Sequence, residues 1–394
     1  MFEYRPVDRP DEIIPLAKAA FSLRQTEHDA IPRWLRSSLE HGREFFGMYE
    51  GERLAAVYML YSFRMRLRNT IVPMGGIGLL GSRLDVRGRG AVRSMLQGAL
   101  ETMRERGHAV SVLDPFDESF YRRYGWEKFE RMRQMEIAPT QIRDMAEPNP
   151  QIACEDLPFP DGPSMAFYND YAADFYTLVQ RGESEWERRT KILEWQPDTA
   201  ARGVVRFSRE DQVVGLLGYN LTRKSGECRS TFHVNLLAYR EGAVLREMLR
   251  YVRRLFHQAK TARLDLPMDA VIWPYLSGRP AKQTIREMFM IRIVSLEALD
   301  GLRVDAPDVE VTVEVTDEQA PWNQGIWRLA LESGCLAVSP ADRPALRCGI
   351  GTLSSVLSGF TSFAEMLAAG QAEALETYAG QDLPKTVTFL ADYF

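Results

Sequence analysis

The sequence predicts an α+β protein in which a unit of antiparallel strands and helices occurs twice and a third α+β segment follows. Three observations support this fold class. Strand-like runs separated by short polar turns follow a helical N-terminal stretch. An amphipathic helix then leads into one more buried strand. The same order returns after a proline-rich boundary near Pro148, which favours mixed, mainly antiparallel sheets covered by helices.

The first unit shows both kinds of periodicity. Apolar residues at three- and four-residue spacing indicate helices, whereas runs rich in aromatic and β-branched residues between polar turns indicate strands. Because tight turns join the strands, we expect them to pair antiparallel. Helices are expected over residues 13–21, 34–39 and 91–106, and strands over 45–49, 54–66, 71–80 and 110–113.

The second unit repeats this order, and the repeat extends to individual residues. The segment GAVRSML from Gly90 aligns with GAVLREML from Gly242, which indicates an internal duplication. After about residue 304 the pattern changes to a β-rich run over 309–315 and a helical stretch over 350–394. We therefore expect three domains, over residues 1–148, 149–303 and 304–394.

Composition narrows the class of protein. The 394 residues are 45% hydrophobic and 26% charged, with a net charge of -5, which is typical of soluble proteins and gives no overall attraction to nucleic acid. The N-terminus lacks a secretory signal, and no apolar run reaches the roughly 20 residues of a membrane span, so a cytoplasmic location is expected. The spacing of the cysteines and histidines predicts neither a disulfide framework nor a metal site. They are Cys154, Cys228, Cys335, Cys348, His28, His41, His108, His233 and His257.

The stretch GGIGLLGSRLDVRGRG, which ends at Gly90, contains two candidate phosphate-binding loops. Gly76, Gly78 and Gly81 spell G-x-G-x-x-G, a dinucleotide fingerprint where the last glycine opens a helix in a βαβ unit. Here helical periodicity begins only near Ala91, and tight turns join the preceding strands. The pattern therefore favours a glycine-broken strand over a nicotinamide oxidoreductase.

The second candidate, RGRG at 87–90, lies immediately before the predicted helix. A helix N-terminus carries a partial positive charge and free N–H groups, so it attracts anions. Arg87, Arg89 and Arg93 are electrostatically mismatched there unless an anion binds, and the glycines let a pyrophosphate approach the backbone. The alternative is three solvated arginines, one of them offset by Asp85.

The strand before this loop suggests which anion would bind. Its glycines and the small Ser82 leave a backbone edge open, so a ligand with amide groups could pair with it as an extra strand. An anion cradle next to such an edge matches coenzyme A, whose pantetheine amides would lie along the strand and whose pyrophosphate would lie on the helix.

Residues 84–92, LDVRGRGAV, resemble motif A of the GNAT N-acetyltransferases, R/Q-x-x-G-x-G/A, with Arg87 and Gly90 matching and Val92 departing from the final small residue. The segments VSVLDPFDESFYRRYGWEKF from Val110 and APWNQGIWRL from Ala320, with the C-terminal DYF, are similar to the Eis (enhanced intracellular survival) type of acetyltransferase. The resemblance covers nearly the whole chain. It implies tandem GNAT domains, the second degenerate, and a C-terminal domain similar to sterol carrier proteins.

The resemblance also implies a reaction. Acetyl-CoA would be the donor, with no metal, and the acceptor would be an amine of a small molecule or peptide, such as an aminoglycoside, a polyamine or a lysine-type amine. Tyr121 would be the general acid, the terminal carboxylate of Phe394 the general base, and the chain would form a homo-oligomer, a hexamer. The residues expected to bind the coenzyme are Leu80, Gly81, Ser82, Arg87, Gly88, Arg89, Gly90, Ala91, Val92 and Arg93.

Alternatives remain open for several of these assignments. Tyr121 could be catalytic or pack in the core, whereas Tyr124 is expected to pack beside Trp126. Phe394 could be a frayed terminus, although the apolar ending FLADYF favours docking. At the second repeat, Glu241 would repel a phosphate, so one donor site per chain is expected. A competing function is non-catalytic binding of a lipid or other hydrophobic ligand by the C-terminal domain.

Overall fold

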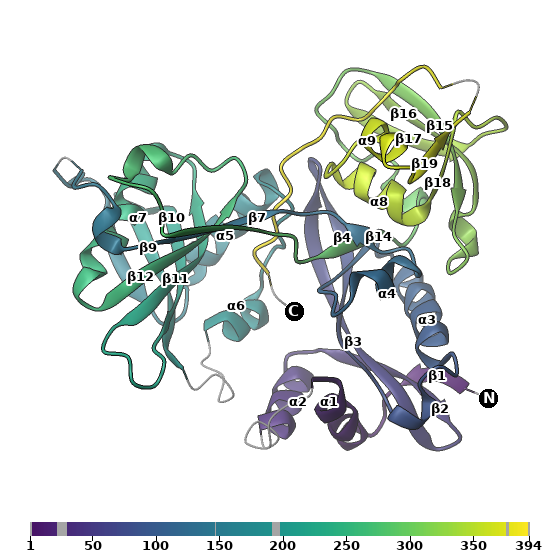
Figure 1. Cartoon of the computed structure of the whole chain (residues 1–394), viewed down its shortest axis with the longest axis horizontal. Coiled ribbons are helices and arrows are strands. Elements are labelled where there is room, and N and C mark those ends of the chain that lie inside the picture. Colours follow the sequence, from purple (N-terminus) through teal and green to yellow (C-terminus); the bar gives the residue numbers. More distant parts are fainter. Residues whose placement is uncertain (1, 22–29, 146, 191–197, 376–377, 393–394) are drawn as a thin grey trace. The chain divides into compact units, whose positions relative to one another are not determined.

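The computed structural model describes residues 2–21, 30–145, 147–190, 198–375 and 378–392. The chain divides into two compact units. The first contains residues 2–130 and 288–388, and the second contains Arg131–Glu287 together with Phe389–Asp392. Each unit consists of mixed sheets with helices against them (Figure 1), which confirms the predicted α+β fold class.

A seven-stranded sheet in the order β1-β2-β3-β4-β5-β14-β6 forms the larger part of the described first unit. Neighbouring strands are antiparallel except β4 and β5, which run parallel because helix α3 crosses over between them. The turns after β2 and β3 contain Gly51 and Arg68 at positive φ, as tight turns require. The strands are β1 (Phe2–Pro6), β2 (Glu44–Glu50), β3 (Arg53–Leu67), β4 (Thr70–Ser82), β5 (Val110–Leu113), β6 (Glu127–Lys128) and β14 (Met290–Ile293).

Helix α3 (Ala91–Glu105) packs its apolar face on this sheet. Met95, Leu96 and Leu100 are buried there, and burying a side chain of this size contributes about 1.5–3 kcal/mol. The position of the predicted helix is therefore confirmed to within one residue at its end. The other helices of this part are α1 (Ile13–Phe21), α2 (Ala30–Glu40) and α4 (Glu118–Arg122).

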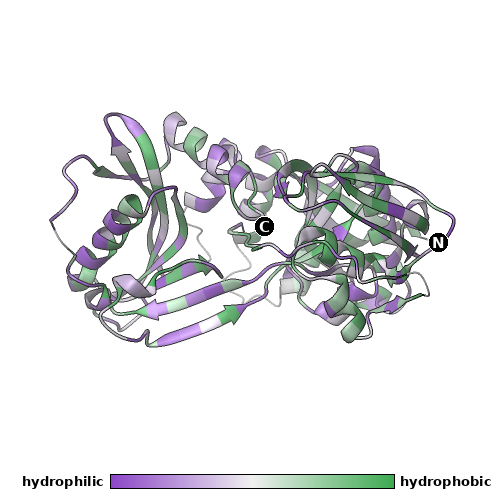
Figure 2. Cartoon of the chain, turned by 90° about the horizontal axis from the view of Figure 1, so that it is seen from above, coloured by the Kyte–Doolittle hydropathy of each residue, from purple (hydrophilic) through white to green (hydrophobic). Residues whose placement is uncertain are grey.

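The second unit repeats the arrangement, with sheet order β13-β7-β12-β11-β10-β9-β8. β11 and β12 are parallel because helix α7 crosses over between them. Buried and half-buried residues alternate along β11, and Figure 2 shows such alternation of hydropathy along strands. The elements are β7 (Met132–Ile137), β8 (Ala153–Leu157), α5 (Gly162–Asp174), α6 (Glu183–Thr190), β9 (Thr199–Arg209), β10 (Gln212–Thr222), β11 (Ser230–Tyr239), α7 (Gly242–Arg254), β12 (Ala259–Pro267) and β13 (Lys282–Arg286).

The C-terminal part of the first unit has its own sheet, in the order β17-β16-β15-β18-β19. Helix α8 joins it to the first sheet, since the Ser354 hydroxyl accepts the Ile293 N–H of β14 at 2.8 Å. The elements are β15 (Val309–Thr316), β16 (Gly325–Glu332), β17 (Cys335–Pro340), β18 (Leu346–Gly349), α8 (Ile350–Ser358), α9 (Phe363–Ala368) and β19 (Ala372–Ala374).

The expectation of helix over 350–394 is wrong after Ala368. Helix α8 ends at Gly359, which has φ +91°, and Gly370, with φ +69°, follows α9. Residues 378–392 form neither helix nor strand. Their backbone is bound by other segments; for example, Thr386 N–H donates to the Gly359 carbonyl at 2.8 Å.

Two strands near the predicted domain borders lie in the sheet of the other repeat. β7 precedes residue 148 in the chain but pairs with β12 and β13 of the second unit. β14 precedes residue 303 but pairs with β5 and β6 of the first unit. The division into domains 1–148, 149–303 and 304–394 stays a prediction. β7 and β14 each pair with the sheet of the other repeat.

Candidate active site

Strand β4 is interrupted by a β-bulge where the coenzyme edge was predicted. Met59 of β3 pairs with Gly78 and Val57 pairs with Gly81, so one residue of β3 faces both Leu79 and Leu80. Leu79 has φ +45°, a left-handed conformation that costs free energy in a branched apolar residue. Such a bulge interrupts the pairing locally and leaves the extra residue outside the ladder.

The other edge of β4 is open beyond Ile77. β5 pairs with β4 only from Met74 opposite Val110 to Ile77 opposite Leu113. From there β4 continues to Ser82, paired with β3 alone among the described strands. The predicted coenzyme residues Leu80, Gly81 and Ser82 thus lie on a strand edge that has no neighbouring strand in the described chain.

The loop after β4 connects this strand to the start of α3. Gly90 precedes the helix with φ +85° and Gly88 has φ +76°, and a Cβ added at either would meet no heavy atom within 4 Å. The first helical hydrogen bond runs from Ser94 N–H to the Gly90 carbonyl at 3.0 Å. The N–H groups of residues 91–93 therefore have no acceptor within the helix, and no side chain that the structure describes caps them.

This geometry decides between the two glycine-rich candidates. Gly76, Gly78 and Gly81 all lie within β4, and α3 begins only at Ala91, so G-x-G-x-x-G does not open a helix here. The three glycines are therefore part of a strand, as the sequence predicts. RGRG at 87–90 is the glycine-rich segment that ends at a helix N-terminus.

The arginines of this loop differ in their partners. Arg83 binds Asp85 at 2.9 Å and Glu50 at 2.8 Å, and Arg89 also binds Glu50. Hydrogen bonds from Arg89 and Arg83 hold the pKa of the Glu50 carboxyl below its ordinary value. Among the described residues, Arg87 has no ion-pair partner. The alternative in which Asp85 offsets one of the three predicted arginines is wrong, because Asp85 is held by Arg83.

Tyr121 lies at the end of α4, whose first turn is capped by Asp117. Its side chain is 3% exposed and packs edge-on against the rings of Phe120 at 5.1 Å and Trp126 at 6.4 Å. No described residue hydrogen-bonds to its hydroxyl. Burial, reinforced by the charge of Asp114, raises the pKa of Tyr121 above its ordinary value, so the phenol is neutral near pH 7.

Both tyrosines pack in the same core cluster, which also contains Trp126. Tyr121 has its ring against Trp126, whereas Tyr124 is half-buried and has its ring against Phe120 at 5.1 Å. The chain folds back after α4, because the N–H groups of Tyr124 and Trp126 both donate to the Tyr121 carbonyl. This return is invisible in the aromatic pattern, which treats both tyrosines alike.

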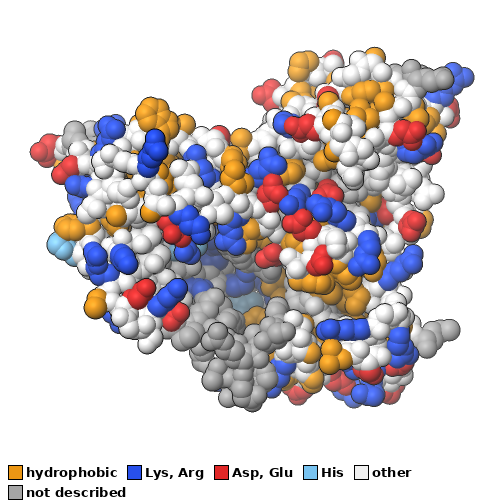
Figure 3. Space-filling model, in the orientation of Figure 1, with side chains coloured by type: hydrophobic (Ala, Val, Ile, Leu, Met, Phe, Trp, Pro, Cys, Tyr) orange, Lys and Arg blue, Asp and Glu red, His pale blue; other side chains and the backbone are white. Residues whose placement is uncertain are grey.

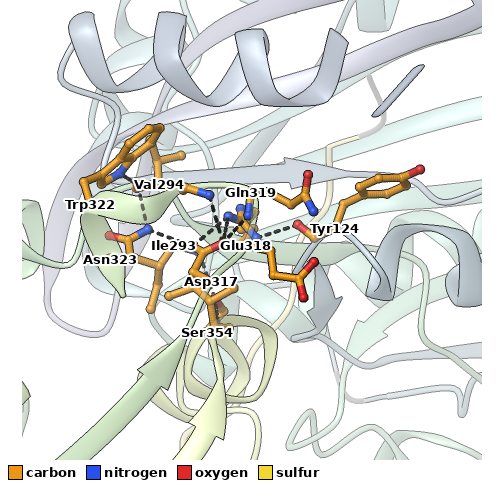
Figure 4. Close-up of polar contacts among 12 residues, drawn as sticks. Tyr124, Ile293, Val294, Asp317, Glu318, Gln319, Trp322, Asn323 and Ser354 are labelled. Carbon is orange, nitrogen blue, oxygen red and sulfur yellow. Dashed lines mark hydrogen bonds and ion pairs between the residues drawn. The ribbon is translucent and has the colours of Figure 1, made fainter. Parts of the chain in front are cut away.

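A buried ion pair holds this loop to the C-terminal part of the chain (Figure 4). Arg292 of β14 binds both carboxylate oxygens of Asp317, at 2.7 and 2.8 Å, and its guanidinium also donates to the Tyr124 carbonyl. Both charged side chains are at most 1% exposed. Gly125 has φ +86°, and a Cβ there would lie 1.7 Å from the Arg292 guanidinium, so glycine is required at that position.

Asp317 is held in turn by its own segment. It accepts N–H groups from Gln319 and Ala320 and the side-chain amide of Asn323 at 3.1 Å. Neither Arg292 nor Asp317 was predicted from the sequence. The signal was present, however, since an arginine inside the apolar run MIRIV must find a buried partner.

The second repeat has an acid where the first has its loop glycines. Glu241 immediately precedes α7 and binds Arg209 at 2.9 Å. Hydrogen bonds from Arg209 lower the pKa of this carboxyl, so it is ionised at the helix N-terminus. A single donor site per chain stays a prediction, and this charge supports it.

The remaining titratable residues do not assemble a metal site in the described part of the chain, where no group of three or more His, Cys, Asp or Glu is placed to hold an ion. His233 binds the buried Asp265 at 2.7 Å, a partner that the sequence did not predict. The four cysteines are free thiols. His28 and Phe394 lie outside the described residues.

No helix in the described ranges is long and apolar enough to cross a membrane. On the face shown in Figure 3, Lys and Arg side chains are interspersed with Asp and Glu over much of the surface.

Comparison with models of protein families accounts for most of the chain. Residues 6–129 match an acetyltransferase (GNAT) domain, residues 177–293 match another acetyltransferase (GNAT) domain, and residues 296–386 match a sterol carrier protein domain. These matches confirm the predicted domain types and their order.

Relatives and solved structures agree with these matches. An uncharacterized N-acetyltransferase of Streptomyces avermitilis is 22% identical over 84% of this chain and 83% of its own length. One from Streptomyces coelicolor is 23% identical over 87% and 85%. A GCN5-related N-acetyltransferase from Anabaena variabilis has a TM-score of 0.86 at 19% identity, and Eis1 from Mycobacterium abscessus has 0.77 at 18%. Each of these two comparisons covers 100% of this chain and 100% of the other chain.

The two acetyltransferase-domain matches show an enzyme of the GNAT class. The chain belongs to the GNAT N-acetyltransferases and has the Eis-type fold of two GNAT domains followed by a sterol-carrier-protein domain, as predicted.

Proposed function

We propose that the chain transfers the acetyl group of acetyl-CoA to an amine, at a single site in the first GNAT domain. The observation that carries this proposal is the continuity of the bulged, open edge of β4 with the uncapped N-terminus of α3. Such an arrangement offers an amide-lined edge and an anion site in the order in which pantetheine and pyrophosphate follow each other along coenzyme A.

The donor would be held mainly by backbone groups. The pantetheine amides would pair along residues 80–82, and the pyrophosphate would accept the N–H groups of residues 91–93. Gly88 and Gly90 leave open space where side chains would stand. Arg87, with no ion pair in the described chain, supplies a positive charge without first breaking another contact.

The general acid would be Tyr121. The amine nitrogen attacks the thioester carbonyl carbon, the C–S bond breaks and the thiolate takes a proton. A raised pKa keeps the Tyr121 phenol protonated, so its O–H is available to donate a hydrogen bond and then a proton to the sulfur. Proton transfer from Tyr121 to a thiolate whose conjugate acid has a pKa of about 8.5 is unfavourable in free energy. The proton therefore moves only as negative charge develops on the sulfur.

The base would be the terminal carboxylate of Phe394, taking the proton that the attacking amine loses. A carboxylate is a weak base in water, with a pKa of about 3.5, so its use requires a desolvated position or a relaying water. The burial of the preceding Leu390, Ala391 and Asp392 supports a docked C-terminal segment.

Acceptor, assembly and location rest on the resemblance to Eis-type enzymes. We propose an amine of a small molecule or peptide as acceptor, with aminoglycosides, polyamines and lysine-type amines as the first candidates. We also propose a cytoplasmic homo-hexamer, which light scattering of the purified protein would test. The alternative of non-catalytic lipid binding is not favoured, because two acetyltransferase domains match the chain.

The test is an acetyl-transfer assay against a panel of amines, with free thiol as the readout. We expect Tyr121→Phe and deletion of Phe394 each to reduce kcat at least tenfold, with Tyr124→Phe as the matched control at wild-type rate. Unchanged rates in both altered proteins would overturn the assigned mechanism. Fluorescent-lipid binding by a protein that transfers no acetyl group would favour the alternative.

A further inference from the structure

Strands β4 and β5 separate at the place where the coenzyme is proposed to bind. Their parallel pairing ends with Ile77 opposite Leu113. β4 continues to Ser82, whereas the chain leaves the sheet after Leu113 and turns into α4. Residues 114–117 thus follow directly from the strand that was the neighbour of β4. A ligand paired along residues 80–82 would therefore have this segment on its other side.

The segment after β5 presents a large aromatic side chain to solvent. Phe116 is 69% exposed. It follows Leu113 by three residues, just as Leu80 follows Ile77, so each lies within about 10 Å of the last pair of the two strands. Single exposed apolar residues are common on protein surfaces, and exposure by itself assigns no role. The role of Phe116 follows from the contacts of its ring.

Ring contacts hold Phe116 beside the proposed acid. Its ring centroid lies 5.3 Å from that of Tyr121, edge-on, and 5.2 Å from that of Phe120. The rings of Phe120 and Tyr121 are themselves 5.1 Å apart, so the three rings contact one another in a triangle. Phe120 is held further by the ring of Tyr124 at 5.1 Å and by the Arg123 guanidinium at 5.3 Å. The exposed ring is therefore supported on a fixed aromatic base.

Phe116 covers the tyrosine that the reaction is proposed to use. Tyr121 is 3% exposed although the ring that it contacts is 69% exposed, so Phe116 lies between the phenol ring and solvent. Asp114, on the same short segment, carries a negative charge that reinforces the raised pKa of Tyr121. Residues 114–116 therefore form one side of the surroundings of Tyr121.

We propose that Phe116 determines which acyl group is transferred: its ring is the wall against which the methyl group of acetyl-CoA packs, and this wall excludes longer acyl chains. This inference rests on the proposed function, which places the thioester sulfur at the Tyr121 hydroxyl. The acyl group is bonded to that sulfur, so it lies beside the ring that packs on Tyr121. Binding of the coenzyme removes apolar surface of Phe116 from water, which favours the complex.

A wall and a purely structural ring have different consequences. If Phe116 only supported Tyr121, its loss would slow the transfer of every acyl group by the same factor. A wall acts on the length of the chain, because its removal opens space that a longer chain can fill. The quantity that separates the two is the ratio of kcat/KM for hexanoyl-CoA to kcat/KM for acetyl-CoA, measured with one amine.

The experiment compares Phe116→Ala with the control Phe256→Ala, at a phenylalanine of the second unit that is 39% exposed. We expect Phe116→Ala to raise the hexanoyl-to-acetyl ratio about tenfold or more. Phe256→Ala should leave this ratio at the wild-type value. A wild-type ratio in Phe116→Ala, or an equal loss for both thioesters, would overturn the proposal.

A second variant tests the wall in the opposite direction and keeps the test decisive if Phe116→Ala does not fold. Phe116→Trp enlarges the ring at an exposed position, so the ratio of kcat/KM for propionyl-CoA to kcat/KM for acetyl-CoA should fall about fivefold or more. An unchanged propionyl-to-acetyl ratio in this variant would contradict the wall.

The two proposals fail in different ways. If no amine accepts an acetyl group from acetyl-CoA, the proposed function is wrong. Calorimetric titration of the same variants with acetyl-CoA and hexanoyl-CoA still tests the wall, because the ratio of the two dissociation constants does not depend on turnover. If acetyl transfer occurs and neither ratio responds to Phe116→Ala, the proposed function stands and the role of Phe116 is wrong.

Discussion

The two GNAT domains share a backbone plan and differ at one helix start. In the first, the parallel pairing of β4 and β5 ends at Ile77, and a bulge follows at Leu79 and Leu80. In the second, the parallel pairing of β11 and β12 ends at Val234, and the bulged residue is the next one, Asn235. The duplicated fold thus places an interrupted strand before the crossover helix both times.

What differs is the charge and shape at the beginning of that helix. In the first domain α3 begins after Gly90, in a left-handed conformation, with arginines nearby and no capping side chain. In the second domain α7 begins after Glu241, an extended residue whose carboxylate is bound by Arg209. The fold therefore supplies the geometry of an anion site in both domains. A few side chains at the helix start determine whether an anion can bind there.

The largest effect is expected from removing the ion pair that holds the Tyr121 loop of the first domain. Asp317→Asn leaves the Arg292 guanidinium buried without a counter-charge, which should cost about 3–5 kcal/mol in the free energy of unfolding. Urea titration would measure this cost. The neighbouring Glu318→Gln, at a side chain that is 83% exposed, is the matched control and should be within about 0.5 kcal/mol of wild type. If Asp317→Asn leaves the free energy of unfolding unchanged, other contacts hold the loop.

The next effect would come from giving the first helix the acid of the second. Gly90→Glu places a carboxylate at the start of α3, where it competes with pyrophosphate for the free N–H groups. We expect the KM for acetyl-CoA to rise about 30- to 100-fold, equivalent to about 2–3 kcal/mol. Gly226→Glu is matched in conformation, with φ +84° against +85°, and also has open space at its Cβ. If both variants keep the wild-type KM, the pyrophosphate does not bind at this helix.

The smallest effect is expected from the arginine without an ion pair. Arg87→Gln removes one exposed positive charge, so the KM for acetyl-CoA should rise about three- to tenfold, and the ratio to wild type should shrink at high salt. Arg343→Gln, at an exposed arginine of the C-terminal domain, controls for the change in net charge. A salt-independent ratio would mean that Arg87 acts by shaping the loop.

Much of the first site was predictable because it depends on local chain features. The start of the helix at Ala91 was predicted from hydrophobic periodicity. Because RGRG directly precedes this start, it was predicted to be the anion-binding loop. The bulge at Leu79 was not predictable, since it depends on how many residues of β3 lie opposite. The burial of Tyr121 instead of Tyr124 also depends on the return of the chain after α4, which hydrogen bonds to the Tyr121 carbonyl determine.

The repeated order of strands and helix, the residues at each helix start and the position of the G-x-G-x-x-G glycines within a strand could be predicted from the sequence. Their causes are local: periodicity, turn residues and the placement of glycine. Long-range packing, in contrast, pairs β7 and β14 with the sheet of the other repeat, and it brings Arg292 to Asp317 and Asp392 to Arg181. A charged residue within an apolar run predicts that a partner is buried with it. It does not predict which residue that partner is, because the packing of segments that are distant in the sequence brings the two together.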